Sequence, residues 1–474
     1  MQTSKQNIHR QNDTFQSNFF QEPKKRHLLN DSICGKKVDL DFNGGNVTSD
    51  AGALLLSEIE QQIGIIRSLS ENIKETRRSY SISHSISEII GQRVYQIACG
   101  YEDANDSNML RADPAIKMAV GRLPQEGLDL ASQPSISRLE NRVSRRDLVR
   151  AAYAFVDNFI ASYEEIPEVI VLDFDDTDST VHGHQQMALF NNYYGNYCYM
   201  PLHVYEGISG KFITAVLRPG KRSSGGETVS YLKRIVRRIR EKWADTIIVF
   251  RGDSHFSSPE LFEYVDRQNN IFSITGLSTN NILLEQVQTT IKTGKALYEK
   301  RQTEVKLYHS FYYQAGSWSQ SRKVVAKVEL SEKGLNVRFI STDMLQAKAR
   351  VLYENIYCAR GNMELRIKDH KTYTKSDRSS CHSFSANQFR LFLHSAAYVL
   401  LYTLRTQLLK GTELANATID TLRLKLLKLG ARVVELKTKI KVHLPDSYPF
   451  KHLLKKCFDV VDYVKHHSNI IQMC

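Results

Sequence analysis

One short segment combines residue types and spacing that suit phosphate chemistry. Between Tyr357 and Lys371, the charged residues Arg360, Glu364 and Lys368 recur at intervals of three and four residues. Positions separated in this way share one face of an α-helix, so a single carboxylate would lie among cations along one stripe. Such a stripe suits a phosphate group. Taken alone, the pattern also fits a solvated helix face with ordinary ion pairs.

Two upstream segments end short apolar runs in aspartate. Residues 167–172 lead into Asp173 and Asp175, and a second run ends at Asp253. Such runs are typical of buried strands, and ligands of open α/β sheets gather beyond the carboxyl ends of the strands. We therefore expect the two strand ends to meet at one edge of a sheet. A helix bearing Glu364 could complete a three-carboxylate cluster there.

Three neighbouring carboxylates raise one another's pKa unless a cation neutralises them. Ligation by oxygen alone selects Mg²⁺ or Mn²⁺ over zinc, and an incomplete protein cage leaves positions for phosphate and water. Two such ions about 4 Å apart activate the attacking oxygen and stabilise the leaving oxygen of a phosphodiester. The pattern predicts metal-dependent phosphodiester cleavage.

The charge of the chain favours a polyanionic partner. Lys and Arg total 64 and Asp and Glu total 51, which gives the 474 residues a formal net charge of +13. Nucleic acid and an anionic membrane surface both fit this charge. The longest apolar run, residues 391–404, includes His394 and is too short for a membrane span, so it predicts a core helix. Seven scattered cysteines without a CxxC pair indicate reduced thiols in a cytoplasm.

The expected elements divide the chain into four parts. We expect a disordered tail without a secretory signal over residues 1–30, and a mainly helical DNA-binding region over 31–162. Residues 163–385 read as three strands followed by alternating helices and strands, which is the order of a ribonuclease H-like α/β core. An antiparallel β subdomain is expected as an insert at about 280–345, and a helical region over 386–474.

Local signals give several boundaries. Ser49 or Asp50 could cap a helix that starts at about residue 50, and Gly430 would end a helix over 415–429. A loop is expected between the first strand and a hairpin over 199–217.

The segment around Glu364 resembles the signature of a known family. Tyr357, Arg360, Glu364 and Lys371 fit Tyr-x2-Arg-x3-Glu-x6-Lys without a gap. This signature is that of the DDE transposases of bacterial insertion sequences, in the branch with a β-strand insertion (DDE transposase domain group 1). The first aspartate of the family stands in an Asp-x-Thr context, as Asp175 does. Segments 130–141 and 426–434 also resemble one subgroup.

The resemblance implies roles for individual residues. Asp175, Asp253 and Glu364 would bind two Mg²⁺ ions, for which Mn²⁺ can substitute. Asp173 competes with Asp175 as the first ligand, because alternate strand residues project to the same side, and only the Asp-x-Thr context favours Asp175. Phosphates near the cleavage point would be held by Tyr357, Arg360, Lys368 and Lys371.

Further contacts with DNA are expected outside the carboxylates. A basic helix over 228–243 carries Arg234, Arg237 and Arg238, which could contact backbone phosphates or belong to a solvated face. Trp318 in the insert could stack a flipped base, as in some relatives, or be a buried or partly exposed sheet tryptophan. The helix that starts near Pro134 could enter a DNA groove or be an ordinary capped surface helix.

The function implied by the resemblance is cut-and-paste transposition. The enzyme would bind double-stranded transposon ends, cleave them and join the freed 3′-OH to target DNA. A homodimer would pair the two ends, in the cytoplasm and near the nucleoid, with no membrane partner. Residues 220–226 lack the P-loop order, so no nucleotide cofactor is expected. The alternatives are a metal-dependent nuclease of the same fold and a noncatalytic DNA-binding protein from a decayed element.

Overall fold

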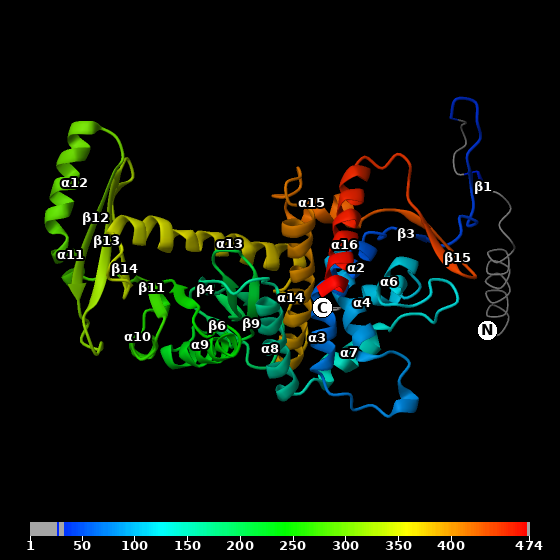
Figure 1. Ribbon diagram of the computed structural model, residues 1–474, viewed down its shortest axis with the longest axis horizontal. Coiled ribbons are helices and arrows are strands. Elements are labelled where there is room, and N and C mark those ends of the chain that lie inside the picture. Colours follow the sequence, from blue (N-terminus) through cyan, green and yellow to red (C-terminus); the bar gives the residue numbers. More distant parts are fainter. Residues whose placement is uncertain (1–25, 28–32, 472–474) are drawn as a thin grey trace, which may run out of the picture.

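Runs of β-branched and apolar residues form one large mixed sheet in the computed structural model, which describes residues 26–27 and 33–471 (Figure 1). The eight strands lie in the order β12-β13-β14-β11-β10-β4-β8-β9. With the many helices around them they confirm the expected α/β class. The strands are β4 (Val169–Asp176), β8 (Leu202–Glu206), β9 (Phe212–Val216), β10 (Ile247–Gly252), β11 (Ile271–Leu277), β12 (Val305–Tyr313), β13 (Arg322–Ser331) and β14 (Gly334–Thr342).

The pairing of β4, β10 and β11 determines where the acidic residues lie. β10 pairs in parallel with β4 on one side and with β11 on the other. β8 and β9 follow β4 as antiparallel neighbours. The three parallel strands therefore end at the same edge of the sheet, here called the carboxyl edge, as expected from their sequences.

Helices cover one face of this sheet. α8 (Arg145–Ala161), α9 (Gly225–Arg240) and α10 (Pro259–Asp266) pack on Phe174 and Phe250 in one apolar cluster. α8 begins with a capping box in which Ser144 and Asp147 bond to each other's backbone N–H groups. These contacts fix both the start of α8 and its position on the sheet.

A helical run over residues 351–373 crosses the opposite face, where Leu352 and Tyr353 pack on Val171 and Val249. In Figure 1 the run extends from the β12–β14 end of the molecule toward α14. Only its middle, α13 (Gly361–Lys368), is a regular α-helix. Wider π-helical turns flank it, with a 3₁₀ turn between the first of them and α13.

The first helices and the C-terminal helices share one apolar core. α14 (Phe384–Thr403) is buried along nearly its whole length and packs against α4 (Ile86–Ala98), α7 (Gln133–Arg142) and α8. The expected core helix over 391–404 is thereby confirmed. Within the described residues, no helix is both long enough and apolar enough to cross a membrane.

The start of α2 (Ala53–Ile63) differs from the expectation. Gly52 is its N-cap residue, and no side chain caps it. The Asp50 carboxylate is fully buried, accepts a hydrogen bond from Tyr101 and pairs with Lys428 at 2.8 Å. These distant contacts engage the carboxylate, so the prediction of a Ser49 or Asp50 cap was wrong. Further short helices are α3 (Ile65–Glu71), α5 (Asp106–Met109) and α6 (Pro114–Ala119).

The insert between β11 and β14 contains more than strands. Two helices, α11 (Asn281–Gln286) and α12 (Gln288–Arg301), precede β12, and α12 packs on β12 and β13. The expected antiparallel strands are present, and β14 pairs with β11, so that they extend the main sheet. The helices were missed because α12 is polar on most of its surface.

Two small sheets formed by short strands were not predicted from the sequence. The loop expected after β4 contains a three-stranded sheet of β5 (Ser179–Thr180), β7 (Asn196–Tyr199) and β6 (Leu189–Asn191). Another small sheet joins β3 (Val47–Thr48) to β15 (Ala431–Leu436) and β16 (Lys439–His443).

The helix expected over 415–429 is a short α15 (Ile419–Leu422) continued by π-helical turns to Leu427, and Gly430 leads into β15. The chain closes with α16 (Lys451–Ile471). β1 (Arg26–His27) pairs with β2 (Asp39–Leu40). The rest of the expected tail over residues 1–30 lies outside the described residues.

Candidate active site

Asp175 lies at the end of β4, where the strand reaches the carboxyl edge. Its carboxylate accepts a contact of 2.8 Å from Nη2 of Arg360, and the two side chains are 13% and 14% exposed. Nη1 of the same guanidinium lies 3.5 Å from the carboxylate of Glu364. One arginine thus bridges the first and third predicted ligands.

The pKa of Asp175 reports how many acids gather here. Burial raises it to about 7, with further contributions from Asp253, Asp176 and Glu364, while Arg360 opposes the shift. Conversely, the Asp175, Asp253 and Glu364 carboxylates raise the pKa of Arg360 against its burial. Arg360 therefore contacts two of the predicted ligands directly, and the charge of the third, Asp253, acts on it from the neighbouring strand end.

Asp253 follows β10 directly and is held by His255. Its carboxylate accepts the backbone N–H of His255 at 3.0 Å and lies 2.6 Å from the ring nitrogen Nδ1. The other ring nitrogen, Nε2, lies 3.3 Å from Asp176. Although burial opposes the charged ring, the two carboxylates raise the pKa of His255 to about 9. From the sequence, His255 is interpreted as a polar loop residue or a substrate-contacting residue, and its position two residues after Asp253 is the available signal for more.

Asp173 is buried within the sheet and is paired with an arginine. It is fully buried, and Arg251 of the neighbouring strand binds both carboxylate oxygens, one of them at 2.6 Å. The same guanidinium donates to the carbonyl of Ile356. Because Arg251 occupies both oxygens, Asp175 is the aspartate of the pair that reaches the edge.

Tyr357 approaches the end of β10 through a gap left by a glycine. A Cβ atom on Gly276 would lie 2.7 Å from the Tyr357 hydroxyl and 2.9 Å from the backbone nitrogen of Ser254. Gly276 in β11 therefore permits the close approach of Tyr357 to the segment that carries Asp253. Sequence reasoning did not single out Gly276.

A comparison with known families shows the family of the chain. The model described as transposase DDE domain group 1 matches residues 30–466. The chain belongs to this family. Curated protein sequences contain no match to the chain. Among solved structures, a cryo-EM structure of piggyBac transposase, in a synaptic complex with hairpin DNA, aligns with 79% of this chain and 80% of its own at 11% identity and a TM-score of 0.40.

The residues of the motif around Glu364 differ in their contacts and in their exposure. Lys371 pairs with Asp178 at 2.8 Å in the loop after β4, whereas Lys368 is exposed. The Glu364 side chain is 67% exposed. The 3₁₀ turn before α13 and the π-helical turn after it change the number of residues per turn, so the ends of the motif depart from ideal α-helical spacing.

The basic residues of α9 lie along the sheet, away from the cluster. Arg238 pairs with Asp157 and Glu241, and Arg237 donates to the Tyr153 hydroxyl. Arg234 is exposed. Arg240, in the last turn, donates to the carbonyl of Thr246 before β10 begins, so this end of α9 lies at the edge of the sheet opposite to Asp253.

Trp318 is part of the protein core. It is 8% exposed and packs edge-on against Phe262 and Tyr313. This position matches the alternative interpretation of a buried tryptophan and leaves no exposed ring for a base to stack on.

DDE transposases generally use divalent metal ions. The donors gathered here are carboxylate oxygens, which suit a hard ion. Among the residues that the structure describes, no three His, Cys, Asp or Glu side chains are grouped closely enough to hold a metal. Arg360 occupies the space between Asp175 and Glu364, and its Nε is buried without a hydrogen-bond partner in the described part of the chain. The donor set fits the ion in chemistry, and ligation requires Arg360 to withdraw.

Proposed function

We propose that the chain is a DNA transposase that binds inverted repeats at transposon ends, cleaves them and transfers their 3′-OH ends to target DNA. The observation that carries the proposal is that Arg360 contacts both Asp175 and Glu364 at the carboxyl edge, where Asp253 directly follows the neighbouring strand. Family membership supports the transposase class. Bound Mg²⁺ or Mn²⁺, in two positions, would supply activation of the attacking oxygen and stabilisation of the leaving oxygen.

The strand order supports a ribonuclease H-like core. From β9 to β11 the order is β9-β8-β4-β10-β11, with the first three strands antiparallel and the last three parallel. Numbered along the chain, this is 3-2-1-4-5. We assign the core to residues 163–385, interrupted by the insert, with 31–162 and 386–474 as flanking regions. Asp175 and Asp253 then end the first and fourth strands.

The residues of the chain have distinct tasks in this proposal. Asp175, Asp253 and Glu364 hold the ions. Arg360, released from Asp175, offers its guanidinium and its unpaired Nε to oxygens of the scissile phosphate. Tyr357, Lys368 and Lys371 contact phosphates on either side. His255 is a positioning residue, because it holds Asp253 on one side and Asp176 on the other.

The test is cleavage and strand transfer on duplexes that carry the inverted repeats flanking the gene. With Mg²⁺, the wild type cuts at the repeat ends and joins the 3′-OH to a target plasmid, while Glu364→Gln binds the duplex, stays folded and does neither. Glu354→Gln, at a half-buried acid of the same helical run that is bound by Arg350 and Tyr308, is the matched control. Cleavage without joining would favour the nuclease alternative. No cleavage by the wild type would favour a decayed element, and full activity of Glu364→Gln would refute the site.

The oligomeric state of the protein on DNA can be tested separately. Two ends must be brought together, so we propose a homodimer on DNA, near the nucleoid of the cytoplasm. Light scattering of the protein with and without end duplexes measures this, and a complex of one chain with one duplex at saturation would contradict it.

A further inference from the structure

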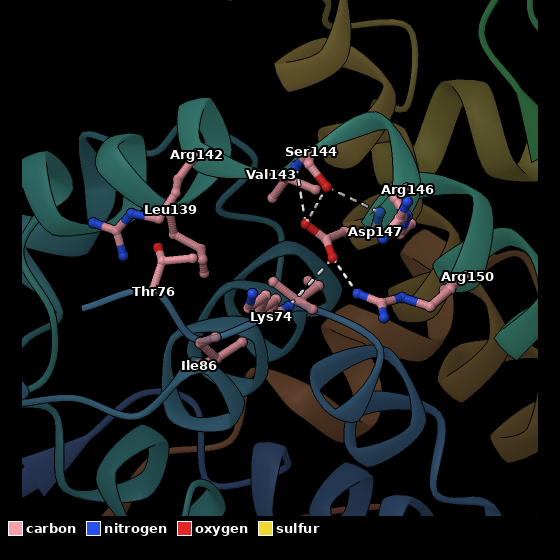
Figure 2. A pocket seen from close by; sticks show the side chains of 11 residues that line it. Lys74, Thr76, Ile86, Leu139, Arg142, Val143, Ser144, Arg146, Asp147 and Arg150 are labelled. Atoms are coloured by element: carbon pink, nitrogen blue, oxygen red, sulfur yellow. Dashed lines mark hydrogen bonds and ion pairs between the residues drawn. The ribbon is translucent and has the colours of Figure 1, made fainter. Parts of the chain in front are cut away.

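A hollow in the helical region gathers cations away from the carboxylate cluster (Figure 2). Its volume is about 420 Å³. It lies where α7 ends and α8 begins, against the segment before α4. The cations that line it come from these separate elements and are Lys74, Arg142, Arg146 and Arg150.

The acids at the hollow are already engaged. Asp147 is 5% exposed and accepts hydrogen bonds from Ser144, from the backbone N–H of Lys74 and from Arg150, as Figure 2 shows. Glu75 lies 4.0 Å from Arg142 but bonds to Arg77. The two carboxylates therefore leave an excess of positive charge facing solvent.

Apolar walls increase the positive electrostatic potential inside the hollow. Apolar side chains of Ile73, Ile86, Leu139 and Val143 line it beneath the cations. A cleft with charges of one sign and low-dielectric walls focuses the electric field and raises the local concentration of an oppositely charged ligand. Lys74 and Arg146 are exposed and able to reach such a ligand.

The hollow also adjoins surfaces that lead to the carboxyl edge. Arg145, next to Arg146, lines a second cavity of about 570 Å³ together with Arg218. Arg218 in turn lies 3.2 Å from Asp176, the neighbour of Asp175 on β4. The first turn of α8 therefore lies between the hollow and the end of β4 that carries Asp175.

We propose that this hollow binds the sugar-phosphate backbone of duplex DNA, independently of base sequence, as a contact separate from the cleavage site. The proposal rests on the proposed function and assigns part of its DNA-binding surface. Lys74, Arg142 and Arg146 make the phosphate contacts. Arg150 mainly holds Asp147.

The experiment measures the salt dependence of binding to a mixed-sequence duplex. Lys74→Gln/Arg142→Gln/Arg146→Gln is compared with Lys300→Gln/Lys333→Gln/Lys455→Gln, which removes the same charge from exposed positions elsewhere. Each lost phosphate contact lowers the slope of log K against log salt by roughly 0.9. We expect the hollow variant to lose about 2 to 3 from the slope, equally for different duplex sequences, and the control to lose less than about 1.

The outcomes separate this proposal from the function on which it rests. If the wild type binds and cleaves end DNA but both variants have the same slope, the hollow is refuted and the function stands. If the wild type binds no duplex, the proposal for the hollow and the proposed function are both refuted. Weakening on one duplex sequence alone would refute backbone recognition. If the triple variant does not fold, Arg146→Gln alone should lower the slope by about 1, and an unchanged slope refutes the proposal.

Discussion

Two aspartates of one strand meet an arginine in opposite ways. Asp173 lies inside the sheet, where Arg251 takes both of its oxygens and neither side chain is more than 3% exposed. Asp175, two residues on, shares Arg360 with Glu364 and Asp253 at the edge. In the interior, one carboxylate is matched by one guanidinium. At the edge, several carboxylates share a single guanidinium.

The difference separates stability from function. A buried carboxylate with both oxygens bound is costly to disturb, because removing its partner leaves an unpaired charge in the interior. At the edge, Arg360 keeps a buried donor unpaired, and Asp175 has a raised pKa. Such a group is ready to exchange its partner for a metal ion or a phosphate.

The largest expected effect is the loss of cleavage in Asp175→Asn. An amide keeps the shape of the side chain but not the charge that holds the ion, so the Mg²⁺-dependent rate should fall on the order of 10⁴-fold. Gel assays of end-duplex cleavage measure it. A rate within a factor of ten of the wild type would mean that Asp175 is not a ligand.

Arg251→Met tests the interior pair. It leaves Asp173 buried and unpaired, so we expect the free energy of unfolding, measured in urea, to fall by about 3–5 kcal/mol. The double variant Asp173→Leu/Arg251→Met removes both charges and should recover much of that loss. If Arg251→Met unfolds like the wild type, the interior pair does not have the role assigned here.

The pH dependence of stability tests the excess of acid at the edge. The pKa of Asp175 is raised from 3.8 to about 7, so the folded, metal-free protein holds this proton more tightly than the unfolded chain does. Stability is therefore lost as the pH rises between these values.

In chelator-treated protein, Asp175→Asn lacks this dependence. At about pH 8 its free energy of unfolding should exceed that of the wild type by on the order of 2 kcal/mol, because the lost contact with Arg360 offsets part of the gain. At about pH 4 the two free energies should be nearly equal. Urea melts at both values measure the difference. A constant difference across the range would show that the Asp175 carboxyl does not titrate there.

Arg360→Ala gives the smallest effect. Because the pKa of Asp175 is already about 7, its carboxyl can take up a proton when Arg360 is removed, so stability near neutral pH should change by about 1 kcal/mol or less. The affinity for the end duplex should fall about tenfold, because the charge-assisted contacts with phosphate are lost. Arg350→Ala is the control and should leave affinity unchanged, because this exposed arginine directly precedes the run and pairs with Glu354 instead. Fluorescence anisotropy measures both.

Sequence alone predicted the strand ends, and it favoured Asp175 over Asp173 only through the Asp-x-Thr context of the resemblance, without a physical reason. Apolar runs ending in Asp175 and Asp253 were enough to place both at one edge, because parallel strands share their carboxyl ends. The sealing of Asp173 depends on the register that sets Arg251 opposite it. No local pattern encodes that register.

Contacts between distant segments explain the other omissions. His255 gains its second carboxylate from β4, and Asp50 is drawn from its helix by Tyr101 and Lys428. The helix spacing predicted that Arg360 and Glu364 would be neighbours, and they are. Ideal periodicity failed beyond α13, where the turns widen.

The helical run over residues 351–373 has a mechanical consequence. It joins the β12–β14 end of the molecule to the α14 end, while Asp175 and Asp253 are anchored in the sheet beneath it (Figure 1). Glu364 is mounted near the middle of this rod. Because the run packs on the sheet and on the helical region, a shift at either of its ends would move Glu364 relative to the two aspartates.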